Sequence, residues 1–419
     1  MKKLIYTNED GIKFYYDSAN NELMPIKSDS LLVESLGTRK SFPKMLNKEN
    51  YTLNMKNTRQ QLILSVTEDC NLRCTYCIYH DDRYNDKDWS CNTHMSFDTA
   101  KKAIDNFLSN SKLTENRFIS FYGGEPLVNF SLIEKCIHYV KETCGVRNIN
   151  FSMTTNGLFL KGKILSFLID NNVFLNVSID GAKDVHDRYR VDINNRPSFD
   201  VIIKNLIFIK KNHKSYFKTN VTFTSVVAPP VKKDGFLDFL ELLQQEVTLT
   251  DIDITDYMKD YMEENNVPMI TTMDEKIEIN RFPKLLQQIQ IERISDVLEV
   301  LKQGKNNVYI PGGYCRPFIK KTFVATDGKY YMCEKFDQKE TNAYGDVEED
   351  ININKIMALN GKINEFMNEH CTRCWANRFC NICYVNLVSS PAEKCKQIQN
   401  ESKELLKLII KENIFIKDE

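Results

Sequence analysis

Residues 62–77 read Leu62-Ile-Leu-Ser-Val-Thr-Glu-Asp-Cys70-Asn-Leu-Arg-Cys74-Thr-Tyr-Cys77, an apolar run followed at once by three cysteines. The apolar run at 62–67 is typical of a buried strand. Three cysteines within eight residues supply one ligand too few for a four-iron cluster, which takes four. A [4Fe–4S] cluster bound here would keep one iron open to a group that is not protein. The spacing therefore predicts chemistry at a cluster. The alternative is a structural zinc, for which His80 is the candidate fourth ligand.

Length and charge exclude several classes of protein. A chain of 419 residues predicts two or three domains. Because 56 basic residues balance 57 acidic ones, no basic field indicates nucleic-acid binding. No apolar run has the length of a membrane span, and the N-terminus lacks the apolar core of a signal peptide. We therefore expect a cytoplasmic protein with neither nucleic-acid nor membrane partners.

The thirteen cysteines are unevenly distributed. Three lie at 70–77 and seven lie between Cys315 and Cys395. Disulfides are disfavoured in a reducing compartment, so clusters at ligand spacing indicate metal sites. The three remaining cysteines are interpreted as ordinary thiols, namely Cys91, Cys136 and Cys144.

From residue 62 onward, short apolar runs alternate with helical patterns. Strands are predicted at 62–67, 118–122, 150–154, 174–179, 219–227 and 249–255. Helices are predicted at 97–110, 131–143, 161–171 and 199–211. This alternation implies βαβ units and a parallel sheet. The predicted fold is α/β, a partial (β/α)6 TIM-type barrel over 61–305.

The flanking segments have other patterns. A hairpin is predicted at 3–16 within a small α+β N-terminal segment over 1–60. A long helix is expected at 281–304, then a cysteine-rich domain over 306–400, then a C-terminal helix over 401–419 whose amphipathic pattern begins near 397.

Polar, glycine-bearing loops follow the predicted strands. In a parallel barrel such loops meet at the C-terminal ends of the strands, where active sites form. The first loop carries Cys70, Cys74 and Cys77, and the next carries Gly123-Gly124-Glu125. Thr154-Thr-Asn-Gly157 and Ser178-Ile-Asp-Gly181 follow the third and fourth strands. Two glycines permit close backbone approach to a ligand, and Glu125 offers a carboxylate.

Together with the cysteine triplet, these loops make the chain resemble the radical S-adenosylmethionine (SAM) superfamily over about residues 60–400. The resemblance implies a [4Fe–4S] cluster on Cys70, Cys74 and Cys77, with SAM on the open iron. It implies that SAM is cleaved to a 5′-deoxyadenosyl radical that abstracts a substrate hydrogen, and that an electron donor such as flavodoxin or ferredoxin supplies the electron.

The resemblance also carries over to single residues. Gly123, Gly124 and Glu125 match the element that holds the SAM amino group. Asn156, Ser178 and the segment His186-Asp-Arg-Tyr-Arg190 lie where related enzymes meet the ribose or carboxylate, and either Arg188 or Arg190 would pair with that carboxylate. Tyr76 matches an aromatic position near the adenine, or it has a packing role.

The second cysteine set resembles the seven-cysteine SPASM extension, which houses two auxiliary [4Fe–4S] clusters. By position, one cluster would be held by Cys371, Cys374, Cys380 and Cys395. The other would be held by Cys315, Cys333 and Cys383, so the chain would bind three clusters in all. The sequence departs from the usual pattern at Asn381-Ile382, where two residues stand in place of three. A pair of zinc ribbons on the same thiolates is the alternative.

Three thiolates on the second auxiliary cluster would again leave an iron open. Such an iron can bind a substrate thiolate, which a thioether-forming reaction requires; alternatively another side chain fills it and both clusters relay electrons. Glu334 follows Cys333 at a position where the related sulfatase maturases carry an aspartate base, so Glu334 is either a general base or a solvated or salt-bridged residue.

The run from Cys371 to Cys380 looks like maturases of cysteine-rich ribosomal peptides, such as the sactipeptide and ranthipeptide enzymes. The resemblance therefore implies an oxidoreductase that acts on a precursor peptide and forms thioether links from cysteine sulfur to carbon. The N-terminal hairpin would offer a strand edge to the precursor's leader, or would merely cap the barrel. The alternatives are carbon–carbon crosslinking, oxidation to formylglycine, and a non-enzymatic iron–sulfur sensor or zinc scaffold.

Overall fold

A computed structural model describes residues 4–7, 13–17, 22–25, 48–77, 79, 93–143, 148–181, 183–227, 247–251, 317–336, 338–380, 382–389 and 391–411. The chain forms two compact units. Unit 1 comprises 1–51, 282–316 and 353–419, and unit 2 comprises 52–281 and 317–352. These divisions differ from the expected domain boundaries, which stay a prediction. Among the described residues, no helix combines the length and apolarity that crossing a bilayer requires.

Unit 2 is built on an eight-stranded sheet in the order β11-β10-β4-β5-β6-β7-β8-β9. The six consecutive strands from β4 to β9 run parallel to one another, which confirms the predicted partial (β/α)6 barrel. They are β4 (Gln61–Thr67), β5 (Arg117–Gly123), β6 (Ile149–Thr155), β7 (Phe174–Ser178), β8 (Val221–Val227) and β9 (Val247–Asp251). β4 has buried residues at six consecutive positions, as expected for a strand covered on both faces.

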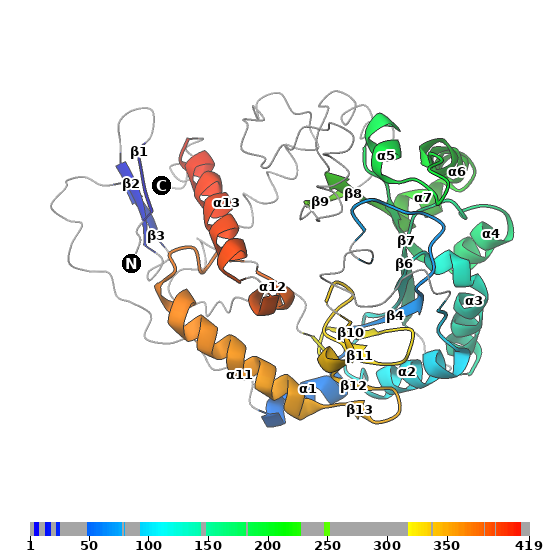
Figure 1. Ribbon diagram of the computed structural model, residues 1–419, viewed down its shortest axis with the longest axis horizontal. Coiled ribbons are helices and arrows are strands. Elements are labelled where there is room, and N and C mark those ends of the chain that lie inside the picture. Colours follow the sequence, from blue (N-terminus) through cyan, green and yellow to red (C-terminus); the bar gives the residue numbers. More distant parts are fainter. Residues whose placement is uncertain are drawn as a thin grey trace. The chain divides into compact units, whose positions relative to one another are not determined.

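Helices connect the strands and lie along the outer side of the sheet (Figure 1). They are α2 (Phe97–Ser109), α3 (Phe130–His138), α4 (Gly162–Asp170), α5 (Lys183–Tyr189), α6 (Phe199–Asn212) and α7 (Lys214–Asn220). In α2 the apolar residues recur at helical spacing and are buried, at Ala100, Ala103, Ile104 and Phe107. Ser96 begins the helix because its side chain accepts a hydrogen bond from the Thr99 N–H at 3.0 Å.

A short hairpin from the cysteine-rich region extends this sheet beyond β4. β10 (Lys321–Val324) pairs with β4 in parallel, with Phe323 opposite Ile63, and β11 (Tyr330–Tyr331) pairs with β10 antiparallel. Phe323, Ala325 and Tyr331 pack with Ile63 in one buried cluster. The hairpin is therefore part of the same unit as the barrel and brings residues 325–334 to the end of β4 that carries the cysteines.

Unit 1 includes a three-stranded antiparallel sheet made of β1 (Leu4–Thr7), β2 (Lys13–Asp17) and β3 (Glu22–Pro25). The predicted hairpin is present, and β3 extends it. Among the residues that the structure describes, three helices belong to the same unit, α11 (Ile353–His370), α12 (Tyr384–Ser389) and α13 (Pro391–Lys411). α1 (Lys48–Asn57) contains the division between the units.

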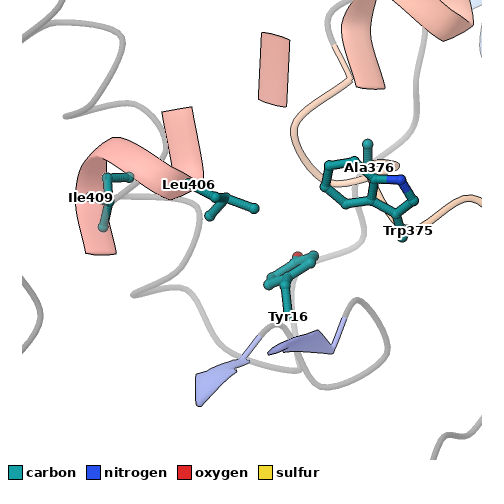
Figure 2. Close-up of a cluster of buried hydrophobic side chains, with 5 residues drawn as sticks. All are labelled: Tyr16, Trp375, Ala376, Leu406 and Ile409. Atoms are coloured by element: carbon teal, nitrogen blue, oxygen red, sulfur yellow. The ribbon is translucent and has the colours of Figure 1, made fainter. Parts of the chain in front are cut away.

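Tyr16 joins the N-terminal sheet to the C-terminal helix. Its ring, 2% exposed, packs in one cluster with Trp375, Ala376, Leu406 and Ile409, and Figure 2 shows it lying between Trp375 and Leu406. The chain's two ends thus share a hydrophobic core.

Several expectations fall on residues outside the described ranges. They are the helix at 281–304, residues 252–255 of the last strand, His80, Cys91, Cys144 and Cys315.

Candidate functional site

The three cysteines after β4 lie around one pocket. Cys70, Cys74 and Cys77 line it together with Glu68, Leu72, Arg73, Tyr79 and Gly124. Burial raises the pKa of the Cys74 thiol to about 12, and burial together with the neighbouring Cys74 raises that of Cys70 further. Without a cation these thiols stay protonated. A group that binds the three cysteines as thiolates therefore has to supply positive charge.

The glycine loop after β5 presses against the residues that precede Cys70. The Gly124 N–H donates to the Thr67 carbonyl at 2.9 Å, and the Glu125 N–H donates to the Asp69 carbonyl at 2.9 Å. A Cβ on Gly123 would lie 2.1 Å from the Thr67 oxygen, and one on Gly124 would lie 2.2 Å from the Asp69 oxygen. The close approach that requires glycine is thus to the chain's own backbone, whereas the sequence suggested approach to a ligand.

Glu125 fastens this loop to the next one. Its carboxylate accepts hydrogen bonds from the Leu127 N–H at 3.1 Å, the Thr155 hydroxyl at 2.8 Å and the Asn156 N–H at 2.7 Å. Burial raises its pKa to about 7 in spite of these donors, because the charged form loses its hydration. The Asn156 side-chain amide in turn donates to Asn71 Oδ1, in the cysteine loop, at 2.7 Å.

A buried ion pair lies at the end of β7. Ser178 ends this strand and is buried, and two residues later Asp180 accepts hydrogen bonds from Arg190 Nε at 2.7 Å and Nη2 at 3.1 Å. The Tyr76 hydroxyl donates to the same carboxylate. Arg190 Nη1 lies 4.0 Å from Cys74 Sγ. Arg190, one of the two residues expected at the SAM carboxylate, therefore has two of its nitrogens bound by Asp180.

Arg188, the other candidate for that carboxylate, belongs to α5 and is half-buried. Its guanidinium carbon lies 5.9 Å from the centre of the Tyr189 ring.

Glu334 is connected to the pocket by Tyr79, a buried residue whose ring lies beside that of the partly buried Tyr122. Tyr79, which lines the pocket, donates a hydrogen bond from its hydroxyl to the Glu334 carbonyl at 3.1 Å. The Tyr79 and Tyr122 rings are 6.4 Å apart. Burial raises the pKa of both phenols, and Cys77, Cys333 and Glu334 raise them further. Among the described residues, Glu334 Oε2 is buried without a hydrogen-bond partner.

Four cysteines of the second set lie close together in unit 1. Burial raises the pKa of the Cys371 and Cys380 thiols to about 12, and Cys374 and Cys395 add to this effect on both. Gln399 Nε2 donates to Cys374 Sγ at 3.4 Å. These are the four that the sequence assigned to one auxiliary cluster. Of the other set, Cys333 belongs to unit 2, Cys383 to unit 1, and Cys315 lies outside the described residues.

Residues 64–243 match the family model of the radical SAM superfamily. This part of the chain is a radical SAM domain. The family implies a [4Fe–4S] cluster and SAM as cofactors.

Curated relatives of the radical SAM domain include sulfatase maturases. The chain is 32% identical over 158 residues to a cysteine-type anaerobic sulfatase-maturating enzyme of Clostridium novyi, a match that covers 37% of this chain and 41% of the relative. It is 31% identical over 152 residues to a serine-type enzyme of Bacteroides thetaiotaomicron, covering 36% of each. The chain thus spans less than half of either relative. A match of 24% identity to a cysteine-type enzyme of Clostridium perfringens covers 76% of this chain and 86% of the relative.

The fold is also similar to that of a solved structure. The structure of native anSMEcpe with bound AdoMet superposes with a TM-score of 0.56 at 17% identity, covering 83% of this chain and 99% of that one.

The pocket of the radical SAM domain has the donor set that the cluster requires. Three thiols border one space. The Leu72 N–H donates to Cys70 Sγ at 3.4 Å, a hydrogen bond of the kind that orients and tunes a cluster ligand. These residues fit the group that the family implies.

Sequence reasoning did not single out several residues of this site. Glu68 is buried and accepts a hydrogen bond from the Thr326 hydroxyl at 2.6 Å, which ties the cysteine loop to the β10–β11 hairpin. Thr326 reaches Glu68 because β10 pairs with β4. This pairing could not be predicted from the sequence, since β10 has only four residues and shows no periodic pattern. Asp180 had a signal, because it stands in the Ser178-Ile-Asp-Gly181 loop at a strand end.

Proposed function

We propose that the protein is a radical SAM peptide maturase that removes a hydrogen atom from a precursor peptide and forms thioether links from cysteine sulfur to carbon. One observation carries the proposal. Three thiols border a single pocket whose wall, Tyr79, is hydrogen-bonded to the main chain of Glu334, a carboxylate with an unsatisfied buried oxygen. A cluster site and a candidate proton acceptor thus adjoin each other in one unit.

In this proposal Cys70, Cys74 and Cys77 hold the cluster that cleaves SAM. The Gly123-Gly124-Glu125 loop binds the amino group, and Asn156 and Ser178 meet the ribose or carboxylate. Arg188 is the better candidate for the SAM carboxylate, because Arg190 is bound by Asp180. Tyr76 packs near the adenine with its hydroxyl held by Asp180.

Two auxiliary clusters complete the proposed set of three. Cys371, Cys374, Cys380 and Cys395 hold one, which their mutual proximity supports. Cys315, Cys333 and Cys383 hold the other, with one iron left for a substrate thiolate.

The reaction balances over these parts. Forming one carbon–sulfur bond removes a hydrogen atom from carbon, a proton from the thiol and one electron. SAM and its cluster supply the radical that takes the hydrogen atom. Glu334 is the proposed proton acceptor, since its buried Oε2 accepts no hydrogen bond from the described residues. The electron would pass to an auxiliary cluster held by the cysteines named above.

A peptide substrate is favoured by the relatives, whose names are those of protein-maturing enzymes. One solved structure, of anSMEcpe with AdoMet and the Cp18Cys peptide, has a TM-score of 0.55. Among the described residues, β1 and β3 are the edge strands of the N-terminal sheet, and an edge strand can bind a leader peptide by strand addition. A flavodoxin or ferredoxin would supply the electron.

Oxidation of a peptide cysteine or serine to formylglycine is the second candidate, which the sulfatase-maturase relatives and the position of Glu334 favour. A third product, a carbon–carbon crosslink, is separated from the others by replacing every cysteine of the substrate.

The test is mass spectrometry of a short cysteine-rich peptide encoded beside the protein, incubated with reduced enzyme and SAM. A thioether removes two hydrogens per link and blocks thiol alkylation, whereas formylglycine gives an aldehyde that a hydrazide reagent traps. Glu334→Gln should lower the yield of modified peptide and leave SAM cleavage in place. Cleavage of SAM with an unchanged peptide would overturn the proposed function.

A further inference from the structure

The Arg190 guanidinium is held between a carboxylate and a cluster cysteine. Nε and Nη2 donate to the two oxygens of Asp180, at 2.7 and 3.1 Å, and Nη1 faces Cys74 Sγ at 4.0 Å. One edge of the guanidinium, formed by Nε and Nη2, is thus bound to the carboxylate in a bidentate way. The third nitrogen, Nη1, faces the Cys74 thiol.

Both charges are buried and their orientation is fixed. The side chain of Arg190 is 8% exposed and that of Asp180 is fully buried. Asp180 also accepts hydrogen bonds from the Tyr76 hydroxyl and from the Val226 N–H at 2.9 Å, and the guanidinium carbon lies 5.4 Å from the centre of the Tyr76 ring. A dry, preorganised ion pair acts on a neighbouring charge far more strongly than a solvated one.

Four chain segments converge on this pair: the cysteine loop, the β7 loop, α5 and β8. We propose that Arg190 and Asp180 are positioning residues that set the reduction potential of the cluster on Cys70, Cys74 and Cys77. The inference rests on the proposed function, in that it requires the cluster. It assigns Arg190 to the cluster sulfur and not to the SAM carboxylate.

The sign of each effect follows from charge. Reduction adds one negative charge to the cluster, and a positive charge or a donor near a ligand sulfur stabilises that charge and raises the potential. Arg190, whose Nη1 lies 4.0 Å from Cys74 Sγ, therefore raises the reduction potential. The negative charge of Asp180 lowers the potential and so reduces the effect of Arg190.

The experiment is a potentiometric titration of the reconstituted full chain, followed by electron paramagnetic resonance. The radical SAM cluster is identified as the signal that changes when SAM is added. Arg190→Gln should disfavour reduction about tenfold, a midpoint about 59 mV more negative for one electron. Asp180→Asn should move the midpoint in the positive direction, and the double variant should lie between the two.

Arg196→Met is the matched control. Arg196 also forms an arginine–aspartate pair, with Asp192 at 2.7 Å, but its side chain is 72% exposed. Its removal should leave the midpoint unchanged, because water screens a surface charge.

Opposite shifts in the two single variants support the inference, since a purely structural role would move both in one direction or lose the cluster in both. Shifts of the same sign, or none in either, overturn it. If Arg190→Gln holds no iron, Asp180→Asn decides alone, and the absence of a positive shift is then fatal to the inference. If the unmodified chain gives no SAM-sensitive signal, the proposed function fails; a normal signal with unmoved midpoints rejects only the role of the ion pair.

Discussion

His186 is a buried histidine whose two ring nitrogens have different partners. Nδ1 accepts a hydrogen bond from the Asp180 N–H at 3.2 Å, and Nε2 lies 2.9 Å from the Ser198 hydroxyl. Because that hydroxyl donates to the Arg190 carbonyl at 2.7 Å, its oxygen is the acceptor for Nε2–H. The neutral tautomer satisfies every group. Burial, with a smaller contribution from Arg190, lowers the pKa of His186 to about 3.

This shift makes stability depend on pH. Below about pH 6.5 the unfolded chain binds a proton at His186 that the folded chain binds only near pH 3, so folding weakens as the pH falls through that window. Between pH 7 and pH 5 we expect this group to remove about 2 kcal/mol from the free energy of unfolding. Urea denaturation of the His186→Asn variant should show a flatter dependence over this range. The exposed His138→Asn variant should keep the steep slope, and equal slopes in all three proteins would contradict the argument.

For single residues, the sequence indicated which side chains lie close together at the site. It did not indicate which hydrogen-bond partners those side chains have. Cys70, Cys74 and Cys77 were expected to bind one cluster, and they line one pocket because all three belong to one short loop. Arg190 was one of two candidates for the SAM carboxylate. Its pairing with Asp180, ten residues earlier in the same connection between β7 and β8, follows no periodic pattern in the sequence.

At the scale of elements, strong periodicity fixed the barrel strands and helices to within a few residues. β5, for example, was expected at 118–122 and spans Arg117–Gly123. The missed elements are short or lie in regions without periodicity. β3 has four residues, and β10 owes its place to burial of Phe323 against Ile63 and not to any alternation of its own. The C-terminal helix begins at Pro391, six residues before its amphipathic pattern, since proline is favoured in the first turn.

The contact between the glycine loop and the cysteine loop predicts the effect of one methyl group. Gly124→Ala places a Cβ 2.2 Å from the Asp69 carbonyl oxygen, so the residues before Cys70 have to move. We expect a loss of about 1–3 kcal/mol in the free energy of unfolding, as for overpacking of a core, together with reduced iron content after reconstitution. Gly361→Ala is the control, because nothing lies within 4 Å of the new Cβ on α11 and alanine favours a helix. If both variants retain full iron, the glycine loop does not position the cysteines.

At the scale of the whole molecule, the compact units do not follow the order of the chain. Unit 1 takes residues from the N-terminus, the middle and the C-terminus, and unit 2 takes the β10–β11 hairpin from within the cysteine-rich region. Linear division of the sequence cannot produce such units, because composition and periodicity report on neighbours in sequence. The N-terminal sheet therefore depends for its stability on α13 and on the segment that carries Trp375 and Ala376.

Tyr16→Ala tests this dependence. The ring lies 4.9 Å from the ring of Phe379 and 6.5 Å from that of Trp375, and its removal leaves a cavity in the cluster that joins β2 to α13. We expect unit 1 to lose about 3 kcal/mol. Hydrogen exchange should accelerate in β1–β3 and α13, while the barrel strands β4–β8 keep their protection. Phe208→Ala is the control. Phe208 is an aromatic residue on α6 that is 52% exposed, so its removal should change neither the stability of unit 1 nor its hydrogen exchange.

If the N-terminal sheet binds a leader peptide, Tyr16→Ala should also weaken binding of the full precursor and leave SAM cleavage intact. Equal loss of protection in the barrel would show that the two units unfold together.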